Sequence, residues 1–226
     1  DLGLYTADNI NISALQISPD GTKVLFASDA SNFAVGDTNR AVDYFIKDIN
    51  TGITTLVNSA ADGTVGNSYY YQSGQSPVFS ADGSKVLFAS YASNLVAGDA
   101  NNTWDYFAKD VNTGVVTYSY SQSNSILSPD GTKMLFVSSD NNLVAGDTNN
   151  TQDVFVRDLT TGSVTLVSSA ADGTVSNGYS NNSVFSPDGS RVLFYSSASN
   201  LLGSNRYSPE GMFIKNLATG AVTVLD

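Results

Sequence analysis

The 226-residue chain contains no cysteine and no histidine, and Glu210 is its single glutamate. Without cysteine there is no disulfide framework, thiol nucleophile or thiolate metal site. Without histidine, Ser-His-Asp catalysis, Cys-His catalysis and histidine-ligated transition metals are excluded. A glycosidase would need two aspartates as its acid and base, and no pair stands out among the many turn and loop aspartates. We therefore expect a protein that is not an enzyme.

Basic residues are also scarce, with ten Lys and Arg against 21 Asp and Glu and a net charge of −11. This balance disfavours nucleic acid and anionic membrane surfaces as partners. No apolar run approaches the ~20 residues that span a bilayer, so we expect no membrane insertion. Eight of the ten basic residues recur at two repeat positions and belong to the scaffold. They are Lys23, Lys85, Lys133 and Arg191 at one position and Lys47, Lys109, Arg157 and Lys215 at the other.

What the chain does contain is a repeat, because a Ser-(Pro/Ala)-Asp-Gly phrase begins at Ser18, Ser80, Ser128 and Ser186. A basic residue and an apolar triplet ending in Leu-Phe follow each phrase, and the spacings of 62, 48 and 58 residues indicate a repeat architecture. The 40 residues after Ser186 and the 18 that end at Ser18 together equal the third spacing. We therefore predict that residues 1–226 form one closed ring in a single domain.

The third repeat shows what one unit contains. Strands are predicted at Ser125–Ser128, Lys133–Ser138, Asp153–Leu159 and Ser163–Ser168, with Pro-Asp-Gly and Thr-Gly forming tight turns. The second strand is apolar almost throughout, which indicates that both of its faces are covered. Four antiparallel strands in a meander, repeated four times, predict an all-β propeller of four blades. The predicted blades are residues 12–58, 76–119, 125–168 and 183–226, with 1–11 as a closing segment.

Two apolar positions recur in every repeat and predict the core between blades. They are Leu25, Leu87, Leu135 and Leu193 in the second strand and Phe45, Phe107, Phe155 and Phe213 in the third.

The repeat resembles the β-propeller repeat of TolB and its relatives. The resemblance rests on Ser-Pro-Asp-Gly-x-(Lys/Arg)-Val-Leu-Phe, then Asp-(Tyr/Val)-Phe-x-(Lys/Arg)-Asp, then Thr-Gly and a Val/Thr-rich strand, and it covers nearly the whole chain. It implies the propeller fold but no single function, because such propellers serve as enzymes, enzyme lids, docking platforms and surface modules. Relatives usually have six or more blades, so four is a departure from their pattern.

The order of strands in a meander places the loops at two opposite edges of each blade. The tight Asp-Gly and Thr-Gly turns share one edge. The long loops between strands two and three share the other edge with the connections between blades. Long polar loops on a rigid scaffold are the usual location of binding residues, so we expect ligands at this second edge.

Three of the loops between strands two and three contain Gly-Asp-x-Asn-x3-Asp. The residues are Asp37, Asn39 and Asp43, then Asp99, Asn101 and Asp105, and then Asp147, Asn149 and Asp153. Carboxylate and amide oxygens on a flexible loop suit Ca²⁺, so up to three calcium sites are predicted. The alternative is that these residues only cap the loop through Asx-turns. The fourth loop places Asn205, Tyr207 and Gly211 at the same positions, so a fourth site should be empty.

Aromatic residues accompany the same loops. Tyr69, Tyr70 and Tyr71 lie in the longest connection, Trp104 in the second acidic loop, and Tyr179 in the connection to the fourth repeat. Tyrosine and tryptophan among amide side chains are typical of a glycan-binding or peptide-binding site. The alternative is that they pack the loops against the blades.

The sequence therefore predicts a monomeric, non-catalytic module that binds Ca²⁺ and presents a loop-rich edge to a glycan or protein. Its acidic composition, rich in Asn, Ser, Thr and Gly, favours a secreted, periplasmic or cell-surface location. Two alternatives remain: a structural spacer with no ligand but the ion, and a hydrolase or lyase that uses aspartates and a metal.

Overall fold

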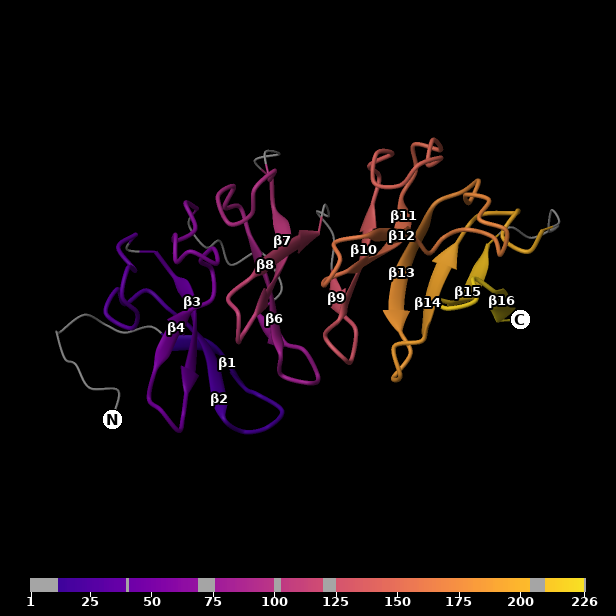
Figure 1. The fold of residues 1–226 in the computed structure, drawn as a ribbon. Helices are drawn as coiled ribbons and strands as arrows, with labels where there is room; N and C mark the ends of the chain where they lie inside the picture. The colour runs from indigo at the N-terminus through magenta and orange to yellow at the C-terminus, as the bar shows by residue number, and fades with distance from the viewer. Residues whose placement is uncertain are drawn as a thin grey trace. The chain divides into compact units, whose positions relative to one another are not determined.

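A computed structural model describes residues 12–39, 41–68, 76–99, 103–119, 125–203 and 210–225. These residues form sixteen strands in four antiparallel sheets, and each sheet takes its four strands in chain order (Figure 1). Within the described residues no helix is long and apolar enough to cross a membrane. The chain divides into two compact units, Asp1–Tyr118 and Ser119–Asp226, and each unit contains two sheets. We refer to the sheets as blades 1 to 4.

Blades 1 and 2 belong to the first unit. Blade 1 contains β1 (Ile12–Ile17), β2 (Lys23–Ser28), β3 (Asp43–Asp48) and β4 (Thr54–Leu56). Blade 2 contains β5 (Val78–Phe79), β6 (Lys85–Ser90), β7 (Asp105–Asp110) and β8 (Val116–Ser119).

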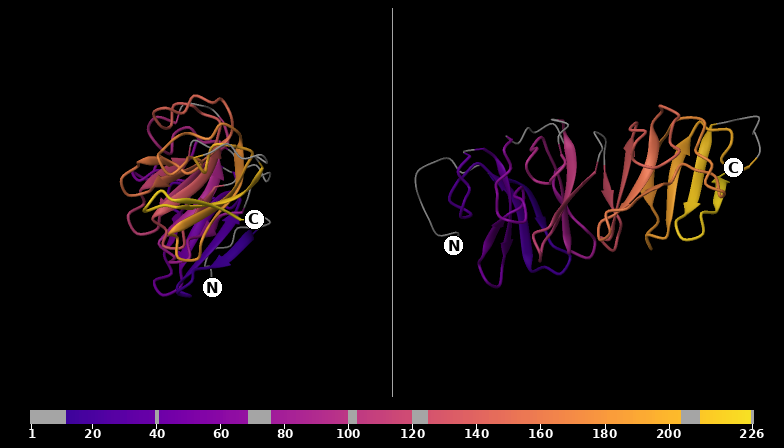
Figure 2. Two further views of the ribbon diagram at one scale, coloured as in Figure 1. Left: turned by 90° about the vertical axis from the view of Figure 1, so that its right-hand side faces the viewer. Right: turned by 45° about the horizontal axis from the view of Figure 1, so that its top comes forward.

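Blades 3 and 4 belong to the second unit. Blade 3 contains β9 (Ile126–Leu127), β10 (Lys133–Ser138), β11 (Asp153–Asp158) and β12 (Val164–Leu166). Blade 4 contains β13 (Ser180–Phe185), β14 (Arg191–Ser196), β15 (Gly211–Asn216) and β16 (Val222–Leu225), and Figure 2 (right) shows these last strands side by side in orange and yellow.

The repeated Ser-Pro-Asp-Gly phrase forms the turn between the first two strands of a blade. In blade 1, Gly21 adopts a φ of +72°, which glycine reaches without steric cost, and its N–H donates to the Ser18 carbonyl. The Ser18 hydroxyl donates to Asp20 Oδ1 at 2.6 Å and accepts the Lys23 N–H at 2.9 Å. The Thr22 N–H also donates to Asp20 Oδ1 at 3.0 Å. The Asp20 carboxylate therefore accepts hydrogen bonds from residues on both sides of the turn.

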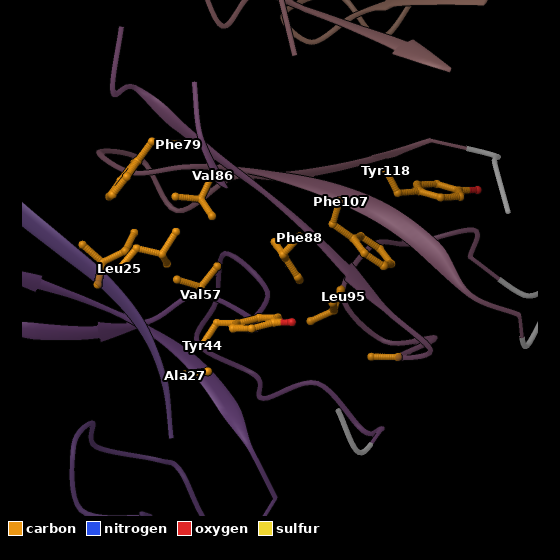
Figure 3. Packing of buried hydrophobic residues seen from close by; sticks show 12 residues of the cluster. Leu25, Ala27, Tyr44, Val57, Phe79, Val86, Phe88, Leu95, Phe107 and Tyr118 are labelled. Carbon is orange, nitrogen blue, oxygen red and sulfur yellow. The ribbon is translucent and has the colours of Figure 1, made fainter. Parts of the chain in front are cut away.

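The two faces of a blade have different neighbours, and blades 1 and 2 show the arrangement (Figure 3). Leu25 and Val57 of blade 1 pack against Phe79, Val86 and Phe88 of blade 2 in one buried cluster. We call the face of blade 1 in this junction its forward face and the face of blade 2 its backward face.

Blades 3 and 4 repeat the junction within the second unit. Leu135 and Val167 on the forward face of blade 3 pack with Phe185, Val192 and Phe194 on the backward face of blade 4. The predicted core phenylalanines of the third strands are fully buried in all four blades. Leu193 is the exception among the predicted core leucines, because it is only partly buried on the forward face of blade 4.

A buried lysine also joins the blades of each unit. Lys109 Nζ in β7 donates to the Leu56 carbonyl at 3.1 Å and the Ser59 carbonyl at 2.7 Å, at the end of blade 1. Lys215 Nζ in β15 donates to the Ser169 carbonyl at 2.7 Å, at the end of blade 3. Burial lowers the pKa of Lys109 to about 8. These contacts show that Lys109 and Lys215 belong to the scaffold.

The two units also share a sequence repeat that occurs once in each unit rather than once in each blade. The sequence Ser-Ala-Ala-Asp-Gly-Thr-Val occurs at 59–65 and again at 169–175, after blades 1 and 3. Each copy forms a small hairpin, closed by the bridges Ser59 to Val65 and Ser169 to Val175. The chain is therefore a tandem of two similar two-blade units.

Candidate functional site

The acidic loop of blade 1 places two carboxylates together in a buried position. The loop turns through Gly36, whose φ of +93° brings Asp37 inward, and it ends where β3 begins at Asp43. Asp37 is 5% exposed and Asp43 is 1% exposed. Burial, followed by the negative charge of Asp43, raises the pKa of Asp37 to about 6, although the Asn39 N–H acts in the opposite direction.

Three carboxylate oxygens of this pair are buried and accept no hydrogen bond of normal geometry. They are both oxygens of Asp37 and Oδ2 of Asp43. Buried carboxylates normally have partners, because an uncompensated buried charge is costly. The three oxygens therefore fit a cation, which would balance the two charges and occupy the missing contacts.

The Asn39 amide takes part in hydrogen bonds within the loop. Its Oδ1 accepts the Ala41 N–H at 2.9 Å, and its Nδ2 donates to Asp43 Oδ1 at 3.2 Å. Asn58 Nδ2 donates to the same Asp43 oxygen. These donors hold the Asp43 carboxylate in place, so the Asx-turn interpretation describes Asn39 while the two aspartates keep their unpaired oxygens.

The acidic loop of blade 3 has the same backbone turn, with Gly146 at a φ of +88°. Asp147 is 4% exposed, and burial followed by the charge of Asp153 raises its pKa. Asp147 Oδ1 is buried without a hydrogen-bond partner. As in blade 1, the Asn149 Oδ1 accepts a backbone N–H, here from Thr151 at 2.8 Å, and its Nδ2 donates to the aspartate that begins the third strand, Asp153, at 2.7 Å.

Asp153 itself is fully compensated, unlike its counterpart Asp43. Its Oδ1 accepts the Ser168 hydroxyl at 2.6 Å and the Ser176 hydroxyl at 2.7 Å. The residue equivalent to Ser176 in the first unit is Gly66, which has no hydroxyl to offer. The serine-to-glycine difference removes one hydroxyl donor from the blade 1 loop, and Asn58 stands where blade 3 has Ser168.

The second acidic loop is only partly described. Asp99 is 8% exposed and Asp105 is fully buried, while Asn101 lies outside the described residues. In blade 4 the equivalent positions 205 and 207 also lie outside them, and Gly211 begins β15. No group of three acidic side chains gathers within the described part of the chain, so a cation there would have two carboxylates plus backbone or water oxygens.

The predicted aromatic residues lie at the same loop-rich edges where they are described. Trp104 packs edge-on against Tyr91 with ring centroids 4.9 Å apart, and Tyr91 remains 45% exposed. Tyr179 is 41% exposed and its ring lies 6.0 Å from that of Tyr195. Tyr69, Tyr70 and Tyr71 lie outside the described residues. Trp104 and Tyr179 belong to different units, so each is a candidate contact by itself.

Reasoning from the sequence missed a second polar cluster at these edges. Asn67 and Ser93 bond reciprocally: Asn67 Nδ2 donates to Ser93 Oγ at 3.1 Å, and the Ser93 N–H donates to Asn67 Oδ1 at 3.0 Å. Asn177 and Ser199 repeat the pattern in the second unit at 2.9 Å and 2.8 Å. The sequence does contain a signal for this cluster, because an Asn follows each Ser-Ala-Ala-Asp-Gly-Thr-Val segment at the same distance.

Four antiparallel meanders in an all-β chain, paired face to face within each unit, define a β-propeller with four blades. Solved propellers agree with this class. The chain is similar to the β-propeller domain of the Trilobed protease from Pyrococcus furiosus, with 15% identity and a TM-score of 0.51 over 95% of this chain and 57% of that chain. The tricorn protease matches with 15% identity and a TM-score of 0.51 over 93% of this chain and 18% of that one.

TolB from Acinetobacter baumannii also matches, with 22% identity and a TM-score of 0.44 over 96% of this chain and 43% of that chain. The chain thus spans less than two thirds of each of these three proteins. No family model matches the chain. No curated protein matches it either. The comparisons support the propeller fold, and any activity has to be inferred from the residues of this chain.

Proposed function

We propose that the chain is a non-catalytic β-propeller module that binds Ca²⁺ through its acidic loops and presents its loop-rich edges to a glycan or protein outside the cytoplasm. The observation that carries the proposal is the buried Asp37–Asp43 pair, three of whose four oxygens accept no hydrogen bond of normal geometry. Ca²⁺ takes about 6–8 oxygen ligands and tolerates irregular loops, so two carboxylates with carbonyl and water oxygens suit it.

The role of the ion in this proposal is structural. Each acidic loop joins the second strand of its blade to the third, and Asp43 and Asp153 are the first residues of β3 and β11. A bound cation would neutralise the paired carboxylates and fix the loop against the sheet. The rigid loops would then hold the half-buried Trp104 and the exposed Tyr179 in place for a partner.

Thermal unfolding with Ca²⁺ and with EDTA tests the metal proposal. A ligand at a hundredfold excess over its Kd stabilises the native state by about 2.7 kcal/mol per site. At this chain length that corresponds to a rise in Tm of roughly 5–10 °C for each occupied site. Asp37→Asn should reduce the rise, whereas Asp29→Asn, an exposed residue in the same loop, should retain it. Equal Tm values with Ca²⁺ and EDTA would refute the metal proposal.

A glycan array and a protein-binding screen test the partner. We expect Tyr179→Ala to weaken binding while Tm changes little, because Tyr179 is exposed. Trp104→Ala should also weaken binding, and it should lower Tm more, because Trp104 is half-buried against the ring of Tyr91. A spacer that binds only the ion is the second candidate, and it predicts no glycan or protein ligand together with a full response to Ca²⁺. It is favoured by the ring contact between Trp104 and Tyr91, which packs the loop upon itself.

A further inference from the structure

The segment that joins blade 1 to blade 2 begins at the acidic loop of blade 1. We call residues 58–67 the connecting segment, and Asn58 is its first residue. Asn58 Nδ2 donates to Asp43 Oδ1, and Asn58 Oδ1 accepts the Tyr44 N–H at 2.9 Å. Asn58 is 8% exposed and Asp43 is 1% exposed. One buried amide thus ties the start of the connecting segment to an aspartate of the proposed cation site.

The connecting segment folds back, so that its end lies beside its start. The Gly66 N–H donates to the Asn58 carbonyl at 2.9 Å, and the bridge between Ser59 and Val65 closes the hairpin between them. Asn94, in the loop between β6 and β7, donates from Nδ2 to the Val65 carbonyl at 2.9 Å. The segment that starts at the acidic loop of blade 1 is therefore fastened to blade 2.

A buried lysine of blade 2 binds the residue that follows Asn58. Lys109 Nζ donates to the Ser59 carbonyl at 2.7 Å and to the Ser59 hydroxyl at 2.8 Å. Lys109 is 9% exposed and Ser59 is 6% exposed. A buried ammonium group is stable only while its acceptors stay in place, because an uncompensated buried charge is costly. A short series of contacts thus runs from Asp43 through Asn58 and Ser59 to blade 2.

The residues beside this series of contacts lie in the core of the junction. Tyr44 follows Asp43, Val57 precedes Asn58, and both pack in one buried cluster with Phe88 of blade 2 (Figure 3). The Val57 N–H donates to the Tyr44 carbonyl at 2.7 Å, and the Tyr44 ring lies 6.3 Å from that of Phe88. Protein interiors are closely packed, so a displacement of Asp43 or Asn58 is transmitted to these groups.

The second unit repeats the arrangement with a different first residue. The Ser168 hydroxyl donates to Asp153 Oδ1 at 2.6 Å and accepts the Val154 N–H at 3.0 Å. Lys215 Nζ donates to the carbonyl of the next residue, Ser169, at 2.7 Å and to its hydroxyl at 3.1 Å. The link from loop aspartate to junction lysine is therefore a property of the two-blade unit.

We propose that a cation at Asp37 and Asp43 controls the connecting segment and, through it, the junction between blades 1 and 2. This inference rests on the proposed calcium site. With the cation bound, the Asp43 carboxylate stays buried and holds Asn58, so Lys109 keeps its acceptors. Without it, the two buried carboxylates repel each other, and the loop turns outward to hydrate them. Asn58 then loses its partner, the connecting segment loosens, and Lys109 becomes accessible.

The reactivity of Lys109 toward a water-soluble amine-acetylating reagent measures the state of the connecting segment. The chain is treated in Ca²⁺ and in EDTA, and peptide mass spectrometry gives the rate at each lysine. A ligand that binds only the closed form lowers the open population by the factor 1 + [L]/Kd. Lys109 should therefore react up to about a hundredfold more slowly at a hundredfold excess of Ca²⁺ over Kd. Lys85, which pairs with Asp110 at 2.9 Å, is the internal control and should react equally in both.

Variants of Asn58 test whether this side chain carries the effect. Asn58→Ala removes both of its hydrogen bonds, so Lys109 should react quickly with and without Ca²⁺. Asn58→Ser gives blade 1 the residue that blade 3 has as Ser168, and it should restore the protection. Asn50→Ala changes an exposed asparagine after β3 and should behave like the native chain. Protection of Lys109 by Ca²⁺ that persists in Asn58→Ala would overturn the proposal.

The affinity for Ca²⁺ gives a second measurement, because coupling between two sites is reciprocal. Lys109→Met removes a positive charge, which by itself would strengthen the binding of a cation. We nevertheless expect the Ca²⁺ affinity to fall by roughly fivefold or more, because the locked segment that favours the ion is lost. Lys85→Met removes the same charge and should not weaken binding. An unchanged or higher affinity in Lys109→Met would contradict the coupling.

Isothermal titration of the native chain separates this inference from the proposed function. If Ca²⁺ does not bind, the calcium site is refuted and this inference falls with it. If Ca²⁺ binds and Asp37→Asn removes one site, the calcium site stands. Equal rates of Lys109 acetylation in Ca²⁺ and in EDTA would then overturn this inference alone.

Discussion

The acidic loops of blades 1 and 3 have the same sequence pattern, the same turn and the same Asn bridge, yet differ in how their carboxylates are compensated. In blade 3, the Ser168 and Ser176 hydroxyls satisfy Asp153. In blade 1, Gly66 replaces Ser176, and Asp43 Oδ2 has no hydrogen-bond partner. Two loops with the same motif can thus differ in how strongly they favour a cation, because the residues that donate to Asp43 and Asp153 from outside the motif differ, with Asn58 and Gly66 in blade 1 and Ser168 and Ser176 in blade 3.

The largest expected effect on stability concerns the buried third-strand phenylalanine that follows both loops. Phe45 and Phe155 occupy the third strand just after Asp43 and Asp153, and both are fully buried. Truncating a buried phenylalanine costs roughly 3–5 kcal/mol, so Phe45→Ala and Phe155→Ala should lower the free energy of unfolding by that amount. Urea denaturation measures it. Markedly unequal losses would show that the two blades are not equivalent scaffolds.

The next effect should separate the loops by their response to calcium. We expect Asp37→Asn to remove about 2.7 kcal/mol of stabilisation at a hundredfold excess of Ca²⁺ over Kd, and Asp147→Asn to remove less. Blade 1 is expected to bind more tightly, because three of its carboxylate oxygens are unpaired against Asp147 Oδ1 in blade 3. Isothermal titration should find one site fewer in each variant. A larger loss in Asp147→Asn would reverse the ranking.

A smaller effect should come from converting one loop into the other. Ser176→Gly gives blade 3 the residue of blade 1 and removes one hydroxyl donor from Asp153. A lost hydrogen bond to a charged group costs about 1.5–3 kcal/mol, so we expect the calcium-free protein to lose up to that amount. The same variant should bind Ca²⁺ more tightly in blade 3. Unchanged affinity would mean that Ser176 does not set the difference between the loops.

The smallest effect concerns pH in calcium-free buffer. The pKa of Asp37 is raised above its ordinary value of 3.8 to about 6, by burial and then by Asp43. A raised carboxyl pKa favours folding of the protonated form, so its contribution is complete at low pH and is lost as pH rises through about 6. Tm without Ca²⁺ should therefore fall between about pH 4 and pH 6, and Asp37→Asn should flatten this part of the profile. A profile identical to that of the native chain would contradict the assignment.

The strands could be predicted closely because each is bounded by a turn with its own chemistry. The predicted strand Lys133–Ser138 is observed as β10, and the third strand of that repeat ends one residue earlier than predicted. The predicted start of blade 4 at residue 183 is too late, since β13 begins at Ser180. A bulge between Asn181 and Val184, with Asn182 at a φ of +48°, interrupts the regular strand pattern there.

The site was predictable only at the level of its carboxylates. The motif located Asp37 and Asp43, and the structure brings them together in a buried position. Their compensation could not be predicted, because Asn58 and Ser176 reach the loops from beyond the next strand. The closing of the ring remains a prediction, since only the junctions inside each unit are described.

The aspartates of the serine–aspartate turns and Asp37 of the blade 1 loop should be protonated at different pH values. Hydrogen bonds from the preceding serine lower the pKa of Asp20, Asp130 and Asp188 to about 2. Their stabilising contribution is therefore present above the ordinary value of 3.8 and is lost only as pH falls towards 2. Mild acid would protonate Asp37 first and release the proposed cation, while the serine–aspartate turns keep their charge. A compartment that acidifies could thus unload this protein reversibly, without melting it.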